Sequence, residues 1–126
     1  LEECGGRICG TEYLFCHAID EIPTDIEPME ALARMALADP MVGPSSDRAA
    51  RICDDIGKFR AEAVVISRIG GASHCAMEGT VIADRIRSDL TLPVLELEVP
   101  PLSDSMRSTL KTRLEALVEI VKQQRG

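Results

Sequence analysis

The sequence predicts an α/β fold, a small and mostly parallel sheet of three to four strands with helices on both faces, in a three-layer arrangement of the Rossmann or flavodoxin type. Two observations predict it. Short apolar runs of strand length alternate with longer segments in which apolar residues recur every three or four positions. Strands that alternate with amphipathic helices form βαβ crossovers, whose strands run parallel. At 126 residues the chain is expected to form a single domain, residues 1–126.

Three segments are expected to be strands. Residues 7–15 are the first, although Gly10 weakens that prediction. Residues 63–66, Ala-Val-Val-Ile, are continuously apolar, which is typical of a strand covered on both faces. Residues 93–99 alternate between apolar residues and glutamates, and this period of two indicates a strand with one solvated face.

Four segments have the spacing of amphipathic helices, residues 26–38, 47–59, 77–89 and 104–124. In the first, Pro28 fits the opening turn and the Asp39-Pro40 step ends the helix. The residues expected to face the core are Met29, Leu32, Ala33, Ala36 and Leu37; Ala49, Ile52, Cys53, Ile56 and Phe59; Val81, Ile82 and Ile86; and Met106, Leu110, Leu114, Leu117, Val118 and Val121.

The composition argues against several classes of protein. A net charge of −7 with scattered basic residues is unfavourable for a nucleic-acid phosphate backbone. No apolar run is long enough to span a bilayer, and no secretory leader opens the chain. We therefore expect a cytoplasmic protein that contacts neither nucleic acid nor membrane. Because the chain begins at Leu1 without a methionine, we expect it to be part of a longer subunit.

The five cysteines do not form a self-contained motif. Their number is odd and no CxxC pair occurs, so neither a zinc site nor a thioredoxin-like redox motif is supported. Cys53 lies on an apolar helical stripe and Cys9 alternates within the first predicted strand, so both are expected in the core. Cys4 is expected to be exposed to solvent.

The connection after residues 63–66 carries the candidate site. In open parallel sheets, ligands bind beyond the carboxyl ends of the strands. Ser73 is expected to cap the next helix, which places Cys75 in its first turn. Backbone N–H groups and the helix dipole there favour the thiolate form. Such a thiolate can act as a nucleophile or bind a soft metal, and the alternative is a cysteine that only fills space.

Neighbouring polar residues are weaker candidates. His74 points about 100° away from the cysteine that follows it, so we expect it to support that thiol rather than act as its base. Cys16 and His17 follow the first predicted strand and are alternative members of the same crevice. Glu96 and Glu98 share a strand face and are expected to be solvated rather than to form a carboxylate pair.

Several stretches together resemble a known family. Residues 61–75 end a strand on a Gly-Gly-Ala-Ser-His-Cys sequence, residues 92–98 read Leu-Pro-Val-Leu-Glu-Leu-Glu, and residues 110–117 contain Thr-Arg-Leu-Glu-Ala. Residues 6–12 and 30–33 resemble the opening of the same region. The chain is thus similar to the C-terminal part of the 2-hydroxyacyl-CoA dehydratase and benzoyl-CoA reductase family, which includes the 2-hydroxyglutaryl-CoA dehydratase D-component.

The resemblance implies an iron–sulfur enzyme of anaerobic metabolism, built from two related subunits that act on an acyl-CoA. In that family three cysteines hold a [4Fe–4S] cluster and an ATP-dependent activator protein delivers an electron. The dehydratases then eliminate water from a 2-hydroxyacyl-CoA through ketyl radicals, and the reductases reduce an aromatic ring. Cys75 matches the third cluster cysteine, and Ser73, His74 and Glu78 are candidates to support it.

Departures from the family pattern limit what this chain is expected to do alone. The other two cluster cysteines of the family lie upstream of the matching region, and Cys4, Cys9 and Cys16 do not match them. Isolated, the chain is expected to hold no intact cluster and to be inactive. Two alternatives remain open, namely a non-catalytic subunit-pairing or scaffold domain that uses the final helix, and a relative that reduces small molecules with a double-cubane cluster.

Overall fold

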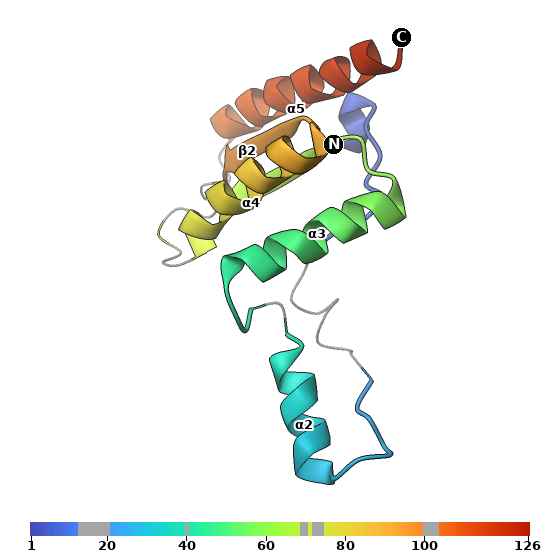
Figure 1. Ribbon diagram of the computed structural model, residues 1–126. Coiled ribbons are helices and arrows are strands. Elements are labelled where there is room, and N and C mark those ends of the chain that lie inside the picture. The colour runs from blue at the N-terminus through green and yellow to red at the C-terminus, as the bar shows by residue number, and fades with distance from the viewer. Residues whose placement is uncertain (13–20, 40, 69–70, 72–74, 100–103) are drawn as a thin grey trace.

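The computed structural model describes residues 1–12, 21–39, 41–68, 71, 75–99 and 104–126, without the side chains of residues 75, 76, 104 and 105. Its elements in chain order are η1 (Glu2–Cys4), α2 (Pro28–Leu37), α3 (Ser45–Phe59), β1 (Val64–Arg68), α4 (Cys75–Leu90), β2 (Val94–Glu98) and α5 (Asp104–Arg125). Figure 1 shows a small sheet between α5 and α4, with α3 beside α4 and α2 extending away from the rest. The predicted α/β class is confirmed.

The two strands pair in parallel, with Val64 opposite Val94 and Arg68 opposite Glu98. Helix α4 connects them, so β1, α4 and β2 form the predicted βαβ unit. In the part of the chain that the structure describes, the sheet has two strands rather than three to four. The difference comes from residues 7–12, the described part of the first predicted strand, which are in neither a helix nor a strand.

Residues 7–12 form an exposed segment beside α3 instead of a strand. A Cβ atom on Gly10 would lie 3.1 Å from Cδ2 of Phe59, so the absence of a side chain at Gly10 permits this close approach. No backbone hydrogen bond joins the segment to β1 among the described residues. Cys9 is exposed as a result, and the prediction that Cys9 lies in the core is wrong.

The core lies between α3, α4 and the sheet. Its buried members are Ala49, Ile56, Ile82 and Ile86, and Val64 and Ile66 of β1 pack against them. This confirms most of the predicted stripes on α3 and α4. Two predicted core residues are exposed, however, Phe59 at 54% and Val81 at 48%. On α4 the buried face includes Ala83, which is 0% exposed, so the stripe is rotated away from Val81.

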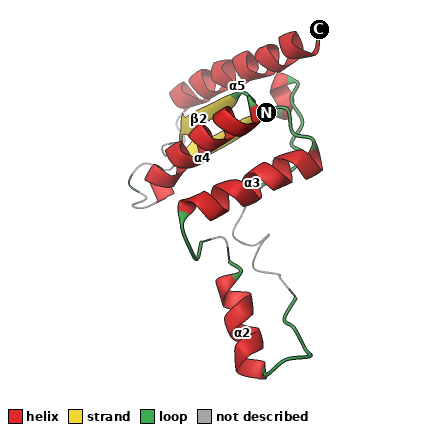
Figure 2. Cartoon of the chain, in the orientation of Figure 1, coloured by secondary structure: helices red, strands yellow, loops and turns green. Residues whose placement is uncertain are grey.

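Helix α2 has the predicted start but not the predicted packing. Pro28 is its first residue, and the carboxylate of Glu27 accepts a hydrogen bond of 3.0 Å from the backbone N–H of Glu30. Ala31 is its only buried residue. The large apolar side chains of the predicted stripe are exposed, Met29 at 70%, Leu32 at 45% and Leu37 at 69%. The stripe is uncovered because α2 packs against no other described helix or strand (Figure 2).

Helix α5 covers the face of β2 that is opposite α4. Leu117 of α5 is 6% exposed and Leu97 of β2 is 4% exposed. Because neighbouring strand residues point to opposite faces, Val94 and Glu96 face α4 while Leu95 and Leu97 face α5. The predicted period of two along residues 93–99 is therefore confirmed, but neither face of β2 is simply solvated.

Candidate functional site

The candidate site lies where β1 ends and α4 begins. β1 ends at Arg68 and α4 starts at Cys75, so Cys75 is in the first turn of the helix, as predicted. The other predicted site residues nearby lie outside the described part of the chain, namely Ser73, His74, Cys16 and His17. Their suggested roles stay predictions, as does any contact of the Cys75 side chain.

Glu78, three residues after Cys75, belongs to a cluster of charged side chains that joins three parts of the chain. Nη1 of Arg48, on α3, donates to Oε2 of Glu78 at 2.6 Å, and Oγ of Ser45 donates to Oε1 at 3.3 Å. Arg48 also donates from Nε and Nη2 to the two carboxylate oxygens of Glu12, at 2.8 and 3.0 Å. We call Glu12, Ser45, Arg48 and Glu78 the Arg48 cluster. It connects the segment 7–12 and the starts of α3 and α4.

The Arg48 cluster is partly shielded from water. The side chain of Arg48 is 18% exposed, that of Glu12 27% and that of Glu78 24%. The hydrogen bond to Glu12 and the charges of Glu12 and Glu78 raise the pKa of Arg48, against an opposing effect of burial. The guanidinium therefore stays charged. Sequence reasoning missed Arg48 because its two carboxylates are 36 and 30 residues away along the chain.

Gly79 lets the first turns of α4 pack closely against β1. It is buried, and a Cβ atom there would lie 3.3 Å from Cγ2 of Ile66 and 3.5 Å from Cδ of Arg68. A larger residue would push the start of α4 away from the end of the strand. Together with the Arg48 cluster, this contact holds the helix start against the carboxyl end of β1.

Glu96 is not the solvated carboxylate that the sequence suggested. Its side chain is 19% exposed and lies 3.0 Å from Nη2 of Arg87 and 3.5 Å from Nη2 of Arg68. The expectation is wrong because α4 covers this face of β2 and supplies Arg87. Glu98 is exposed, as expected. The two glutamates thus form no carboxylate pair, and Glu96 has a structural role between α4 and the sheet.

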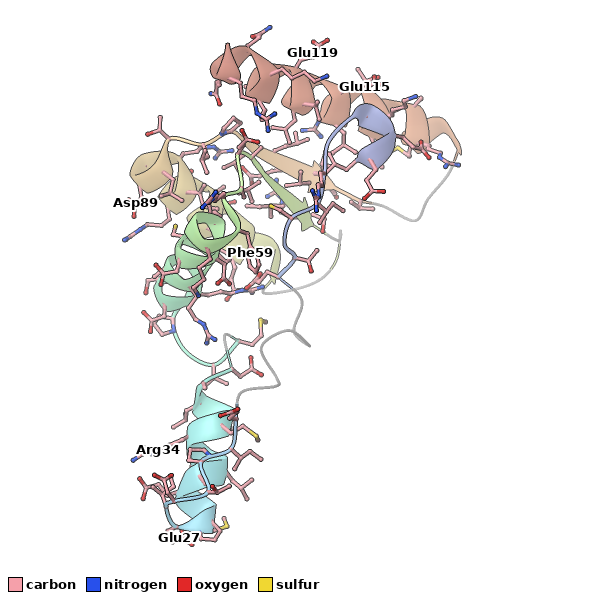
Figure 3. The ribbon with its side chains drawn as sticks, turned by 90° about the vertical axis from the view of Figure 1, so that its right-hand side faces the viewer. Glu27, Arg34, Phe59, Asp89, Glu115 and Glu119 are labelled. Atoms are coloured by element: carbon pink, nitrogen blue, oxygen red, sulfur yellow. The ribbon has the colours of Figure 1, made fainter. Side chains whose placement is uncertain are left out.

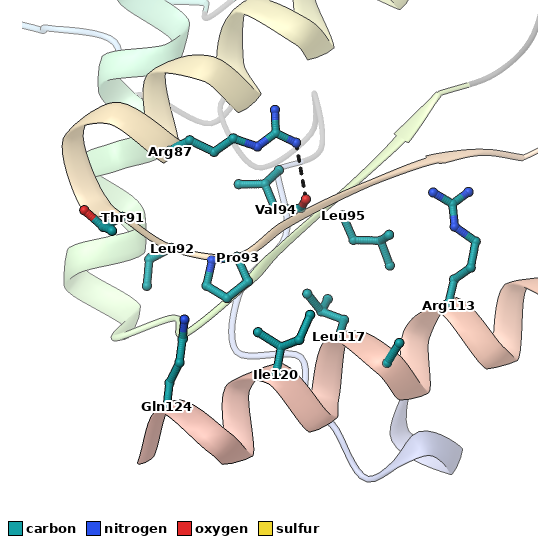
Figure 4. Close-up of a pocket in the computed structure, with 11 residues that line it drawn as sticks. Arg87, Thr91, Leu92, Pro93, Val94, Leu95, Arg113, Leu117, Ile120 and Gln124 are labelled. Atoms are coloured by element: carbon teal, nitrogen blue, oxygen red, sulfur yellow. Dashed lines mark hydrogen bonds between the residues drawn. The ribbon is translucent and has the colours of Figure 1, made fainter. Parts of the chain in front are cut away.

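A groove of about 570 Å³ lies between β2 and α5 (Figure 4). Its walls are largely apolar and include Leu95 and Leu117. Nη2 of Arg87 donates to the carbonyl of Val94 at 3.4 Å, and Nη2 of Arg113 donates to the carbonyl of Glu96 at 3.0 Å. Arg113 belongs to the Thr-Arg-Leu-Glu-Ala stretch that resembles the family, so that arginine binds the backbone of β2. Among the described residues that line the groove there is no carboxylate, imidazole or thiol, so the start of α4 remains the candidate site.

Of the other described cysteines, Cys53 has an environment that does not suit a metal-binding thiolate. Cys53 packs against the core, and burial raises the pKa of its thiol. Cys4 is half-buried rather than exposed, and its thiol lies 3.9 Å from the carbonyl oxygen of Lys111. Among the residues with described side chains, no group of three His, Cys, Asp or Glu is placed to hold a metal ion.

Comparison with known proteins adds a family to this geometry. A sequence model of the family described as "2-hydroxyglutaryl-CoA dehydratase, D-component" matches residues 1–121. No curated protein and no solved structure matches the chain. Within the described ranges, no helix has the length and apolar character needed to cross a membrane.

Proposed function

The chain belongs to the family of the 2-hydroxyglutaryl-CoA dehydratase D-component, and on that basis we propose that it is the C-terminal α/β domain of an iron–sulfur subunit in a 2-hydroxyacyl-CoA dehydratase or benzoyl-CoA reductase type enzyme. The family match favours radical dehydration of an acyl-CoA over ring reduction. In this proposal the subunit works in the cytoplasm with a related second subunit and an ATP-dependent activator protein. The observation that carries the proposal is the match over residues 1–121 together with a cysteine that opens α4.

The chemistry of the available donors fits one cluster ligand. Iron–sulfur clusters are held by cysteine thiolates, and the start of a helix favours a thiolate. Cys75 has that position, whereas burial raises the pKa of the Cys53 thiol and Cys9 lies on the exposed segment 7–12. The remaining ligands of a cluster would have to come from elsewhere in the subunit. When bound, the cluster would supply low-potential electron transfer and an iron position for the substrate.

The residues around Cys75 would act by positioning it. The Arg48 cluster fastens the first turn of α4 to α3, and Gly79 allows that turn to lie against β1. A ligand on a fixed helix start keeps its distance to ligands on other segments, which is what a rigid cluster requires. In this proposal Glu78 supports the site through its hydrogen bonds with Arg48 and Ser45.

The test is the Cys75→Ser variant of the full-length subunit, reconstituted with iron and sulfide under strict anaerobiosis. We expect a loss of cluster absorbance and of iron content, because a serine hydroxyl is a poor ligand for iron in a sulfur cluster. Cys9→Ser is the matched control, since Cys9 is exposed on a different segment, and it should retain both. Full iron content and absorbance in Cys75→Ser would show that Cys75 is not a ligand.

A non-catalytic role in subunit pairing is the second candidate, and the exposed apolar side chains of α2 favour it. Uncovered apolar patches on soluble domains commonly mark contacts with other proteins. The sequence had suggested the final helix as that contact, but Met29, Leu32 and Leu37 make α2 the more apolar surface. A wild-type full-length subunit that pairs with its related subunit but never takes up iron would favour this second candidate.

A further inference from the structure

One edge of β1 has backbone groups without a partner. The N–H of Val64 donates to the carbonyl of Pro93 at 3.0 Å, so the backbone groups of Val64 point toward β2. Because these groups alternate along a strand, those of Val65 and Ser67 point the other way. In the described ranges, no backbone hydrogen bond reaches Val65 or Ser67 on that side. The edge of β1 away from β2 can therefore accept one more strand.

The part of the chain that faces this edge is its own segment 7–12. All of the segment and all five residues of β1 line one cavity of about 600 Å³. Among the described residues, the segment makes no backbone hydrogen bond, and the side chain of Ile8 is 54% exposed. Most polar residues of the cavity belong to the segment or to the Arg48 cluster, namely Arg7, Thr11, Glu12, Arg48 and Glu78. The cavity thus separates two parts of one chain, each with unpaired backbone groups.

Both ends of the segment are held by other elements. At its start, Gly6 lies against α5, where a Cβ atom on Gly6 would be 3.2 Å from Cγ2 of Val118. At its end, the carboxylate of Glu12 accepts hydrogen bonds from Arg48 at 2.8 and 3.0 Å. Between these anchors an extended chain covers about 20 Å, and a strand of the length of β1 covers about 17 Å. The segment therefore has the length of the strand that it faces.

The segment runs in the same direction as β1. It passes Phe59, at the end of α3 (Figure 3), and then reaches Arg48, near the start of α3. β1 follows the end of α3 and ends at Arg68, which lies against Gly79 in the first turns of α4. Arg48 binds the same part of α4 through Glu78. Because the segment and β1 end at the same place, pairing between them would be parallel.

The segment also has the alternating faces of a strand. Gly10 and Glu12 both contact α3, so the odd-numbered residues face away from α3. The residues of β1 that pack against the core between α3 and α4 are even-numbered too. No residue from 6 to 12 has a positive φ, so the backbone is compatible with a strand. With Glu12 level with Arg68, where β1 ends, Cys9 would lie beside Val65.

We propose that residues 7–12 are a strap, anchored by Glu12 on Arg48, that closes onto the free edge of β1 and becomes a third, parallel strand. Closure pairs the backbone of the strap with the unpaired groups of β1 and covers the exposed side chain of Ile8. Because Arg48 also holds Glu78, the strap is tied to the ion pairs that fix the start of α4. This closure does not depend on the cluster role proposed above.

The test traps the closed strap with a disulfide. Val65→Cys is combined with the native Cys9, and Cys16→Ser leaves a single cysteine in the tryptic peptide that carries Cys9. Neighbouring strands bring Cα atoms within the disulfide range of about 4.4–6.8 Å. We expect mild oxidation with diamide to join Cys9 to the introduced thiol, which peptide mass spectra will identify. The matched control combines Val65→Cys with Cys9→Ser and Ile8→Cys. Its strap thiol faces α3, so its disulfide should form at least about tenfold more slowly.

Amide exchange followed by NMR shows whether the trapped strap is a strand. Oxidation should slow exchange at Ser67 about tenfold, and reduction should restore it. Exchange at Ile66, whose N–H faces β2, should change little.

A second comparison tests the anchor. Glu12→Gln removes the charge that Arg48 binds, and it should slow disulfide formation by about twofold to fivefold. Glu3→Gln is the matched control, because Glu3 lies on η1 outside the strap, and it should leave the rate unchanged. If Val65→Cys does not fold, the exposed pair Thr11→Cys and Ser67→Cys replaces it, with Cys9→Ser.

Four outcomes would overturn the proposal. The first is the absence of the disulfide while Cys9 still reacts with iodoacetamide, or equally fast formation in the Ile8→Cys control. The second is a disulfide that leaves exchange at Ser67 unchanged, because the strap would then form no ladder with β1. The third is a rate in Glu12→Gln equal to that in Glu3→Gln, since Arg48 would not then anchor the strap. The fourth is a rate that rises with protein concentration, which would place the disulfide between two copies of the chain.

Discussion

Replacing Arg48 tests most directly how the first turn of α4 is held. Arg48→Met keeps an aliphatic stem of similar length and removes the charge that Glu12 and Glu78 share. The matched control is Arg34→Met on α2, because Arg34 makes a single ion pair with Glu30 in which both side chains are more than half exposed. Both substitutions remove one guanidinium from a helix. The difference between their free energies of unfolding therefore reports how the surroundings of Arg48 differ from those of Arg34.

The magnitude follows from burial and geometry. Hydrogen bonds to charged groups stabilise by about 1.5–3 kcal/mol when shielded, and exposed ion pairs by about 0.2–1 kcal/mol. Exposures of 18% for Arg48, 27% for Glu12 and 24% for Glu78 place these contacts between the two cases. We expect Arg48→Met to lower the free energy of unfolding by about 2 kcal/mol and the coupling of Arg48 to Glu78 to be about 1 kcal/mol. Arg34→Met should cost about 0.3–0.5 kcal/mol.

The assay is urea unfolding followed by circular dichroism, applied to the wild type, Arg48→Met, Glu78→Gln and the double variant. Amide exchange in the first turn of α4 should accelerate in Arg48→Met and stay unchanged in Arg34→Met, because Arg48 contacts that turn and Arg34 lies on α2. A coupling free energy below about 0.3 kcal/mol would refute the reasoning. The reasoning would also be refuted if Arg48→Met lowered the free energy of unfolding by no more than Arg34→Met does.

Three further predictions concern the core and the thiol of Cys53. Ile86 is 0% exposed, so Ile86→Ala should lower the free energy of unfolding by about 2–5 kcal/mol, whereas Val81→Ala, at a side chain that is 48% exposed, should change it by less than about 0.5 kcal/mol. If urea unfolding showed that Ile86→Ala and Val81→Ala lower the free energy of unfolding equally, the packing of α4 described above would be contradicted. Burial raises the pKa of the Cys53 thiol, so its protonated form is favoured in the folded state. The resulting stabilisation is complete below the ordinary thiol pKa of about 8.5 and is lost as the pH rises through the folded pKa. The wild type should therefore lose more stability than Cys53→Ala in mildly alkaline urea unfolding. At pH near 8, iodoacetamide should label Cys9 before Cys53 in peptide mass spectra, and equal labelling rates would contradict the burial of Cys53.

The sequence alone determined where most of the regular elements lie. α3, α4 and α5 occupy the segments whose apolar residues recur at helical spacing, and β2 occupies the segment that alternates. These patterns are readable without a structure because helix and strand geometry set which neighbouring side chains share a face. Ile82 and Ile86, one turn apart on α4, were predicted to be buried together and are.

The tertiary structure decided which of those faces are covered. Leu32 of α2 lies on an apolar stripe with helical spacing, yet it is exposed because no described helix or strand packs against α2. Glu96 shows the opposite case, since a residue with the pattern of a solvated face is covered by α4. Whether a face of a helix or strand is buried depends on where segments distant in sequence are placed. Local periodicity contains no information about that placement.

The candidate site shows the same division. The position of Cys75 at a helix start could be predicted, because an apolar run of strand length followed by glycines and a serine has a local signature. The group that holds this helix start could not be predicted, because Arg48 meets Glu12 and Glu78 only when three separate segments come together. Thus the sequence determined where α4 begins, and only the tertiary structure decided what fixes that turn in place, since ion pairs form between residues that folding brings within a few ångströms.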